Sequence, residues 1–308
     1  MTAVPDLPPL AKLASPLAPQ HGYNSTPLPG LRILRSEAML DDVPVLYRPG
    51  AVFVLQGAKQ GVLDGQVLRY DVDHYLAVSV PVPFRMTSQA SAEHPLLALY
   101  FDFDLQLAAE IVSALDRRVG TRPAERARSL VSSPTEPAIA QLLDRLLRAL
   151  AQPDELAILG PGLLRELHYR VLVGQQGGAL MAALRGDGAT TRLVNSLNLI
   201  RRRYAEPLTI ADLAREAGMS APSYHAGFKA LTGSTPIQYI KAIRLHEARW
   251  MIAMRTGPIA SIATRVGYAS AAHFSRDFKR HFDRNPSEEA EWMRHHLGEL
   301  ATERKPSG

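Results

Sequence analysis

The last hundred or so residues contain one helix-turn-helix pattern twice, with the second copy offset by 49 to 50 positions. Leu213-Ala214 returns as Ile262-Ala263, and Gly218 returns as Gly267. After a one-residue insertion the further matches are Ser220 with Ser270, Tyr224 with Phe274, Phe228-Lys229 with Phe278-Lys279, and Pro236 with Pro286. A pair of such units predicts two short recognition helices at a fixed separation, which could enter two successive major-groove segments of one duplex.

The local chemistry of each copy supports this interpretation. In the first copy Thr209 is placed to cap a support helix, Gly218 to end it in a left-handed conformation, and Ser220 to cap the next helix. Tyr224 and Phe228, spaced i and i+4, then face inward. The second copy repeats the arrangement with support residues Ile259, Ile262, Ala263 and Val266, the turn Gly267-Tyr268-Ala269-Ser270, and inner residues Phe274 and Phe278.

A pair of ordinary helical hairpins in an all-α domain is the alternative interpretation. The repeat, the basic outer faces and the spacer between the copies favour DNA binding instead. From Pro236 to about Thr256 there is no glycine and no internal proline, and apolar residues recur with a helical period. A continuous helix there would fix the distance between the two recognition helices.

The C-terminal part resembles the DNA-binding domain of the AraC/XylS family of transcription regulators. The resemblance runs from about Leu193 to Pro286, about a third of the chain. It rests on LTIADLAREAGMSAPSYHAGFKALTGSTPIQYI, IRLHEAR and IASIATRVGYASAAHFSRDFKRHF. It implies a sequence-specific DNA-binding transcription factor with two helix-turn-helix motifs joined by a long helix.

Candidate DNA contacts follow from the outward positions of the two recognition helices. The candidates for base contact are Ser223, His225, Ala226, Lys229, Ala272, His273, Ser275, Arg276, Lys279 and Arg280. The candidates for the DNA backbone are Ser220, Arg244, Arg249 and Ser270. Arg276 is the strongest candidate, for a guanine or a phosphate, although the family also uses this arginine structurally. Arg244 and Arg249 could instead be solvated or paired with Glu247.

The first recognition helix departs from the family pattern. Ala226 and Gly227 stand where a long polar or basic side chain is common. A methyl group can contact the thymine methyl but forms no hydrogen bond, and glycine costs about 1 kcal/mol of helix stability relative to alanine. The first recognition helix is therefore expected to discriminate weakly between bases.

Composition limits the other function classes. From Arg192 onward the formal charge is about +7, and the preceding part carries about −2 of the total of +5. The chain has no cysteine, which excludes disulfides and thiolate chemistry. It has no apolar run of membrane-spanning length and no signal-peptide pattern, so we expect a cytoplasmic protein without a membrane partner.

The residues from about Leu31 to Phe103 read as short β-strands separated by turn signals, typical of a small sandwich or barrel. Helical patterns follow at about Leu105–Arg118, Pro137–Ala151 and Gly160–Val173. We expect an α+β chain: residues 1–22 a flexible extension, 23–185 a cupin-like domain with trailing helices, 186–192 a linker, 193–295 an all-α DNA-binding domain, and 296–308 a tail. The glycine-rich and glutamine-rich stretch Gly174–Gly178 also belongs to the connection.

The first domain has its own resemblance. The runs YRPGAVFVLQGAKQGVLDGQVLRYD and LLRELHYRVLVGQQGGAL are similar to the N-terminal domain of one AraC-type subfamily, a cupin-like barrel followed by helices. In such regulators the barrel binds a small molecule and the helices often mediate dimerisation. A barrel of this size can hold one small ligand. The candidate anchors for an effector are Tyr47, Gln56, Lys59, Tyr70 and Tyr75.

No cofactor, metal site or catalytic residue is predicted. His74 and His94 lack the spacing of metal-binding cupins, and the carboxylates Asp102 and Asp104 fit solvated positions at a strand end. There is no phosphate-binding glycine loop or serine nucleophile elbow. The expected partners are double-stranded DNA, a small organic effector and a second copy of the chain as a homodimer, with RNA polymerase a further candidate. The alternatives are a cupin-type binding protein or enzyme whose C-terminal helices contact proteins, and a DNA-binding architectural protein with an inert barrel.

Overall fold

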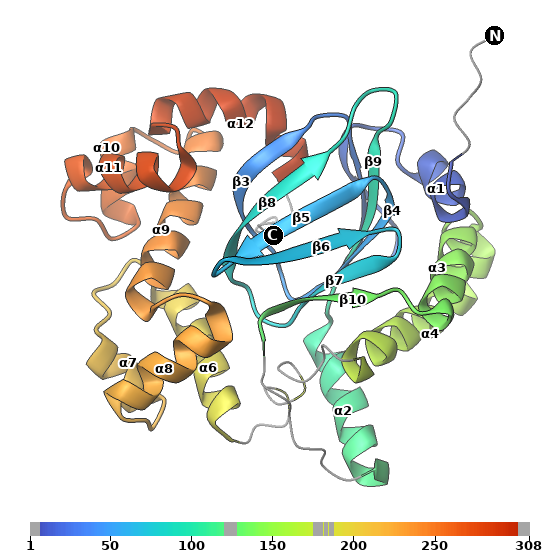
Figure 1. Cartoon of the computed structure of the whole chain (residues 1–308), viewed down its shortest axis with the longest axis horizontal. Coiled ribbons are helices and arrows are strands. Elements are labelled where there is room, and N and C mark those ends of the chain that lie inside the picture. Colours follow the sequence, from blue (N-terminus) through green and yellow to red (C-terminus); the bar gives the residue numbers. More distant parts are fainter. Residues whose placement is uncertain (1–6, 120–127, 175–180, 182–183, 185–187, 301–308) are drawn as a thin grey trace.

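The computed structural model describes residues 7–119, 128–174, 181, 184 and 188–300. Two antiparallel sheets form the N-terminal half and face each other across a shared core (Figure 1). The six-stranded sheet has the order β1 (Gly22–Ser25), β2 (Leu31–Ser36), β9 (Leu96–Asp102), β4 (Gly50–Gln56), β7 (His74–Val78) and β10 (Leu130–Pro134). The four-stranded sheet has the order β3 (Leu40–Leu46), β8 (Pro83–Gln89), β5 (Ala58–Leu63) and β6 (Gln66–Asp71).

The central strands of the six-stranded sheet are apolar on both faces, because both faces are covered. In β9, Leu96, Ala98 and Tyr100 point into the core between the sheets. The alternate residues Leu97, Leu99 and Phe101 point into a second core under helices. This period of two assigns every residue of a strand to one of two different environments.

Helices cover the outer face of the six-stranded sheet (Figure 1). They are α1 (Pro9–Ala14), a 3₁₀ turn (Ser15–Leu17), α3 (Pro137–Leu150) and α4 (Pro153–Val173), with α2 (Leu105–Val119) packed on α4. Part of the extension that was expected to be flexible is therefore helical, and Ala11 and Ala14 are fully buried. Their small side chains let α1 lie close against the sheet and α3, which stabilises a segment too short to be helical alone.

The C-terminal half is helical, as the sequence predicts. Its helices are α6 (Gly188–Arg203), α7 (Ile210–Glu216), α8 (Ala221–Thr232), α9 (Pro236–Ala253), α10 (Ile259–Arg265), α11 (Ala271–Phe282) and α12 (Pro286–Leu300). The structure corrects the expected linker at 186–192, because α6 begins at Gly188 and Thr191 is buried within that helix. The expected tail likewise begins inside α12. The segments 175–180 and 301–308, and residues 186 and 187 of the linker, lie outside the described residues.

The helix caps are those that the sequence predicts. The side chains of Thr209, Ser220 and Ser270 each accept a hydrogen bond from the backbone N–H three residues further on. Gly218 and Gly267 have φ values of 59° and 87°, in the left-handed region. The long spacer helix α9 runs without a break and begins with a capping box at Thr235 and Gln238.

The two helix-turn-helix units have different neighbours. The core of the first unit, with Leu213, Tyr224 and Phe228, is continuous with the core between the two sheets. The second unit has a core of its own, which includes Phe274 and Phe278. The first unit thus packs as an extension of the two-sheet N-terminal part of the chain, here called the β domain. The apolar core of the second unit is separate from that of the β domain.

The two equivalent turn glycines make a matched test of the repeat. At Gly267 an added Cβ would lie 2.5 Å from the carbonyl oxygen of Ala205, whereas at Gly218 the nearest atom is 3.9 Å away. We expect Gly218→Ala to cost about 1 kcal/mol, from left-handed backbone strain alone. Gly267→Ala should cost clearly more, because the backbone must also move. Thermal unfolding of both variants measures this difference, and equal melting temperatures would contradict the contact at Ala205.

Candidate nucleic-acid interface

The two recognition helices present the same pattern of exposure. In α8 and α11 alike, the first three residues are exposed, the fourth and eighth are buried, and the ninth and tenth are exposed again. The buried residues are Tyr224 and Phe228 in one helix and Phe274 and Phe278 in the other. The predicted base-contact residues therefore lie on outward or lateral positions of both helices, as the helical period requires.

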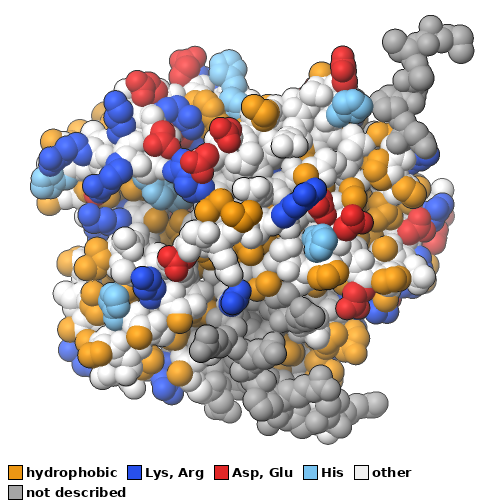
Figure 2. All heavy atoms as spheres, in the orientation of Figure 1, with side chains coloured by type: hydrophobic (Ala, Val, Ile, Leu, Met, Phe, Trp, Pro, Cys, Tyr) orange, Lys and Arg blue, Asp and Glu red, His pale blue; other side chains and the backbone are white. Residues whose placement is uncertain are grey.

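On α11 the outward face is basic. Arg276, Lys279 and Arg280 are exposed. Arg280 is also paired with Asp277, whose carboxylate lies 3.3 Å from Nζ of Lys241 on α9. The pair limits the freedom of Arg280, so Arg276 is better placed to reach a ligand. Figure 2 shows Lys and Arg side chains gathered over α10 and α11, at the upper left of the molecule.

On α8 the outward face is made of small residues. Ala226, Lys229 and Ala230 are exposed and His225 is half-buried. Gly227 has a structural cause, because a Cβ there would lie 3.0 Å from Cδ1 of Leu193 on α6. The close approach of α6 therefore leaves little room for a side chain at this departure from the family pattern.

The candidate backbone serines have a defined role in the fold. Ser220 Oγ accepts from the N–H of Ser223 at 3.3 Å, and Ser270 Oγ accepts from the N–H of His273 at 3.4 Å. Both hydroxyls thus sit at the N-terminal ends of the recognition helices, where backbone N–H groups and the helix dipole favour anions. A phosphate contact by either serine stays a prediction.

Arg244 does not face solvent as a phosphate ligand would. Its guanidinium donates to the carbonyl oxygens of Tyr204 at 2.6 Å, Gly267 at 3.0 Å and Glu206 at 2.8 Å. It therefore ties α9 to the loop after α6 and to the turn of the second unit. The carbonyl groups of these irregular segments need donors, and a planar guanidinium supplies several at once.

Arg249 is also misassigned by the sequence prediction, because it has 0% exposure. Its Nε donates to Oε1 of Glu289 on α12 at 2.6 Å, and its Nη1 donates to the carbonyl oxygen of Pro44 on β3 at 3.0 Å. The partner is thus Glu289 and not Glu247. A guanidinium held in this way cannot reach a phosphate.

Three of the five candidate effector anchors meet inside the β domain. Lys59 Nζ donates to the hydroxyls of Tyr47 at 3.1 Å and Tyr100 at 2.7 Å, and the Tyr47 hydroxyl lies 3.4 Å from that of Tyr70. Burial raises the pKa of all three tyrosines well above that of a free phenol, so they stay protonated. Tyr100 was missed, although it shares a strand face with Leu96 and Ala98.

The other two candidates lie elsewhere. Tyr75 points to the opposite face of the sheet and stacks on Phe53, with 5.0 Å between ring centroids. The reason is the strand period, because Leu76 and Val78 take the inner positions. Gln56, at the end of β4, donates to the carbonyl oxygen of Pro95 at 2.7 Å. The sequence did not reveal which strand face was inward.

The C-terminal domain docks on one edge of the β domain through specific polar contacts. The Tyr239 hydroxyl donates to the carbonyl oxygen of Pro81 at 2.8 Å, and Arg85 Nη2 pairs with Asp283 at 2.7 Å. Beside them, the rings of His246 and His281 approach with Nε2 atoms 3.3 Å apart. Burial, reinforced by His246, lowers the pKa of His281 well below its ordinary value, so this imidazole is neutral.

Within the described part of the chain, no helix is long and apolar enough to cross a membrane. Among the same residues, no group of three or more His, Asp or Glu side chains is arranged to hold a metal ion.

Comparisons with known proteins cover most of the chain. The family model described as the AraC-type transcriptional regulator N-terminus matches residues 27–179, and a helix-turn-helix domain model matches residues 213–291. The HTH-type transcriptional activator RhaS of Yersinia pestis is 31% identical over 101 residues, which are 33% of this chain and 37% of the relative. A probable thc operon regulatory protein of Rhodococcus erythropolis is 35% identical over 98 residues, 30% of this chain and 29% of its own length.

A likeness over most of the fold comes from solved structures. ToxT from Vibrio cholerae, in a structure described as bound to an unsaturated fatty acid, aligns with a TM-score of 0.55 at 13% identity. The alignment covers 88% of this chain and 97% of ToxT. The fold class predicted from the sequence, a mixed α+β domain followed by a helical domain, is therefore confirmed.

Proposed function

Because the chain belongs to the family of AraC-type transcriptional regulators, we propose that it binds specific sequences of double-stranded DNA and thereby regulates transcription. The observation that carries the proposal is the repeated pattern on α8 and α11, two capped helices of equal length with the same buried and exposed positions. The continuous helix α9 joins the two units. Residues 193–295 would form the DNA-binding domain, with α6 and α12 as its ends.

Arg276 is the residue with which to test the DNA interface. The full chain should bind a duplex selected from a randomised pool, with an affinity that falls steeply with salt. Arg276→Ala should weaken binding to that duplex by about 1–3 kcal/mol if the arginine reads a base, and leave random DNA little affected. The control is Arg265→Ala, because Arg265 is an exposed arginine on the support helix α10. Equal loss on both duplexes would assign Arg276 to phosphate, and salt-insensitive binding would favour a protein-contact role for these helices.

The interior of the β domain supports binding of a small organic acid as effector. A lysine ammonium with 3% exposure, surrounded by phenol hydroxyls, is costly to bury and attracts an anion. The hydroxyls of Tyr47 and Tyr100 could each donate to a carboxylate that displaces them from Lys59, and the Tyr70 hydroxyl lies beside that of Tyr47. The ToxT structures are described with an unsaturated fatty acid and with a substituted butenoic acid, both carboxylic acids, bound to that protein.

The effector proposal predicts a dependence on the acid group and on Lys59. A panel of unsaturated fatty acids and arylbutenoic acids, each with its matched alcohol, is added to the full chain in thermal-shift assays. Acids should raise the melting temperature and alcohols should not, because only a carboxylate pairs with an ammonium group. Lys59→Met should abolish the shift, while Lys241→Met, on the exposed side of α9, should keep it. Equal shifts from acids and alcohols would contradict the proposal.

A homodimer would form through the exposed side of α4. Several large apolar residues lie exposed there: Ile158, Leu159, Tyr169 and Val173. Exposed apolar patches on helices mark contact surfaces. Sedimentation velocity of the wild type and Ile158→Asp tests this, and an Ile158→Asp variant that stays dimeric would exclude this face.

A further inference from the structure

The turn between β5 and β6 lies directly against the end of the first recognition helix. A Cβ added at Gly233, which ends α8, would lie 3.0 Å from Cγ of Leu63 and 3.2 Å from Cβ of Asp64. The β5–β6 hairpin therefore contacts the backbone of α8 directly at this point, because Gly233 has no side chain to hold the two apart.

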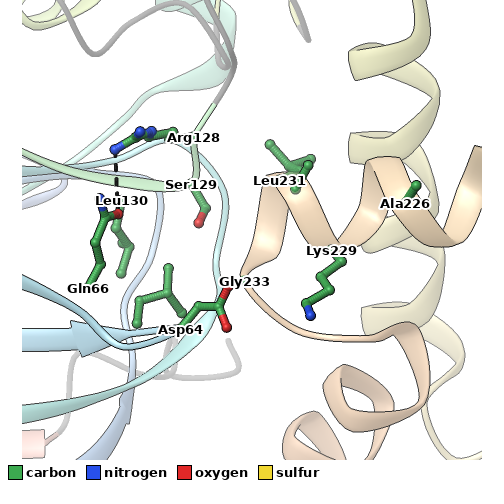
Figure 3. A pocket seen from close by; sticks show the side chains of 11 residues that line it. Asp64, Gln66, Arg128, Ser129, Leu130, Ala226, Lys229, Leu231 and Gly233 are labelled. Atoms are coloured by element: carbon green, nitrogen blue, oxygen red, sulfur yellow. Dashed lines mark hydrogen bonds between the residues drawn. The ribbon is translucent and has the colours of Figure 1, made fainter.

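A cavity of about 450 Å³ separates the hairpin from the rest of the outward face of α8. Ala226 and Lys229 line it from the helix, and Asp64, Ser129 and Leu130 line it from the β domain. In Figure 3, Asp64 and Lys229 extend from the two walls into the space between them. The C-terminal half of α8, which includes predicted base-contact residues, therefore faces the β domain across this cavity.

The repeat shows that this face of α8 is unusual in composition. Ala226, Ala230 and Gly233 correspond to Arg276, Arg280 and Asp283 in the second unit. The last pair is the most informative, because both residues end their helix in the left-handed conformation, with φ values of 72° and 59°. The backbone alone therefore accepts an aspartate at this position, and the nearby hairpin gives Gly233 a separate reason to lack a side chain.

We propose that the small-residue face of α8 (Ala226, Ala230 and Gly233) is covered by the β5–β6 hairpin of the same chain, which touches it at Gly233 and faces Ala226 and Ala230 across the cavity. The docked hairpin keeps the first recognition helix out of DNA. A major groove is about 12 Å wide and is filled by one helix of 10–12 Å diameter. Base edges can therefore reach Ala226 and Lys229 only after the hairpin leaves.

Contacts on the β3–β8 side of the hairpin hold the docked arrangement. Tyr239 binds the carbonyl of Pro81, Arg249 binds the carbonyl of Pro44, and Arg85 pairs with Asp283. These contacts lie on α9 and at the end of α11, so they fix the whole C-terminal domain and not α8 alone. Undocking must break them together, which gives two discrete arrangements and not a gradual one.

The hairpin also offers a route from the proposed effector site, and this step rests on the proposed function. Lys59 and Leu63 lie on the same strand, β5, and their spacing of four places both on one strand face. Between them Gly61 packs tightly on the ring of Phe84, 3.0 Å from where its Cβ would be. A shift of β5 caused by a carboxylate at Lys59 would therefore move Leu63 relative to α8.

A disulfide between the hairpin and α8 tests the docking directly. The chain contains no cysteine, so Asp64→Cys with Gly233→Cys introduces a single thiol pair. The two Cβ positions are 3.2 Å apart, close to the 3.5–4.5 Å that a disulfide spans. The oxidised full chain should bind its selected duplex at least about tenfold more weakly than the reduced form, with recovery in dithiothreitol. Each single variant under the same oxidant is the control for strain at Gly233.

The outcomes separate docking from the proposed function. A cross-link that forms fully but leaves affinity unchanged would overturn the block to DNA, and a cross-link that fails to form would overturn the docking. A reduced protein that binds no duplex would instead contradict the proposed function, and the yield of cross-link would still decide whether the hairpin docks.

A second variant tests the same contact without thiols. Leu63→Ser weakens the hairpin side of the contact and leaves every predicted DNA ligand intact. It should raise affinity for the selected duplex about threefold or more, because a larger fraction of the chain is then competent to bind. Val67→Ser, an exposed apolar residue on β6 of the same hairpin, is the matched control. An unchanged or lower affinity for Leu63→Ser would count against the proposal.

Discussion

The arrangement of the two halves depends on one buried guanidinium. Arg249 joins α9 to α12 through Glu289 and joins both helices to the β domain through the carbonyl of Pro44. Removing two charges from water costs several kcal/mol per ion, and good geometry with further hydrogen bonds must offset that cost. Glu289 also accepts from Arg284, and the Arg249 guanidinium lies 4.8 Å from the ring centroid of Phe282. Such a group has few alternative partners, so it fixes the orientation of α9 against β3.

That orientation makes the two helix-turn-helix units unequal. The apolar core of the first unit is shared with the β domain, so α8 is held close to the β5–β6 hairpin. The second unit buries Phe274, Phe278 and Phe282 in a core of its own. Its recognition helix carries the exposed arginine Arg276 on an open surface. The difference between the copies is therefore one of environment as well as of side chains.

The polar cluster inside the β domain stands apart from the rest of the core. Lys59 and three tyrosines are placed among apolar side chains, where a buried cation weakens folding unless it is well solvated by hydrogen bonds. Stability alone gives no reason to keep a lysine there. A buried ammonium group favours an anionic partner, which is the physical argument for an acidic effector.

The sequence by itself determined the elements whose causes are local. The caps at Thr209, Ser220 and Ser270, the left-handed glycines and the inward aromatic residues all depend on neighbours within a few positions. The repeat shows the serine caps, the glycines and the aromatic residues twice. Only the tertiary structure decided which partners distant residues have. Arg249 was expected at a phosphate and lies buried against Glu289, and Tyr75 was expected in the barrel and lies on its outer face. An arginine motif looks the same whether it meets DNA or a carboxylate, and a strand's period does not say which face is inside; packing of remote segments settles both.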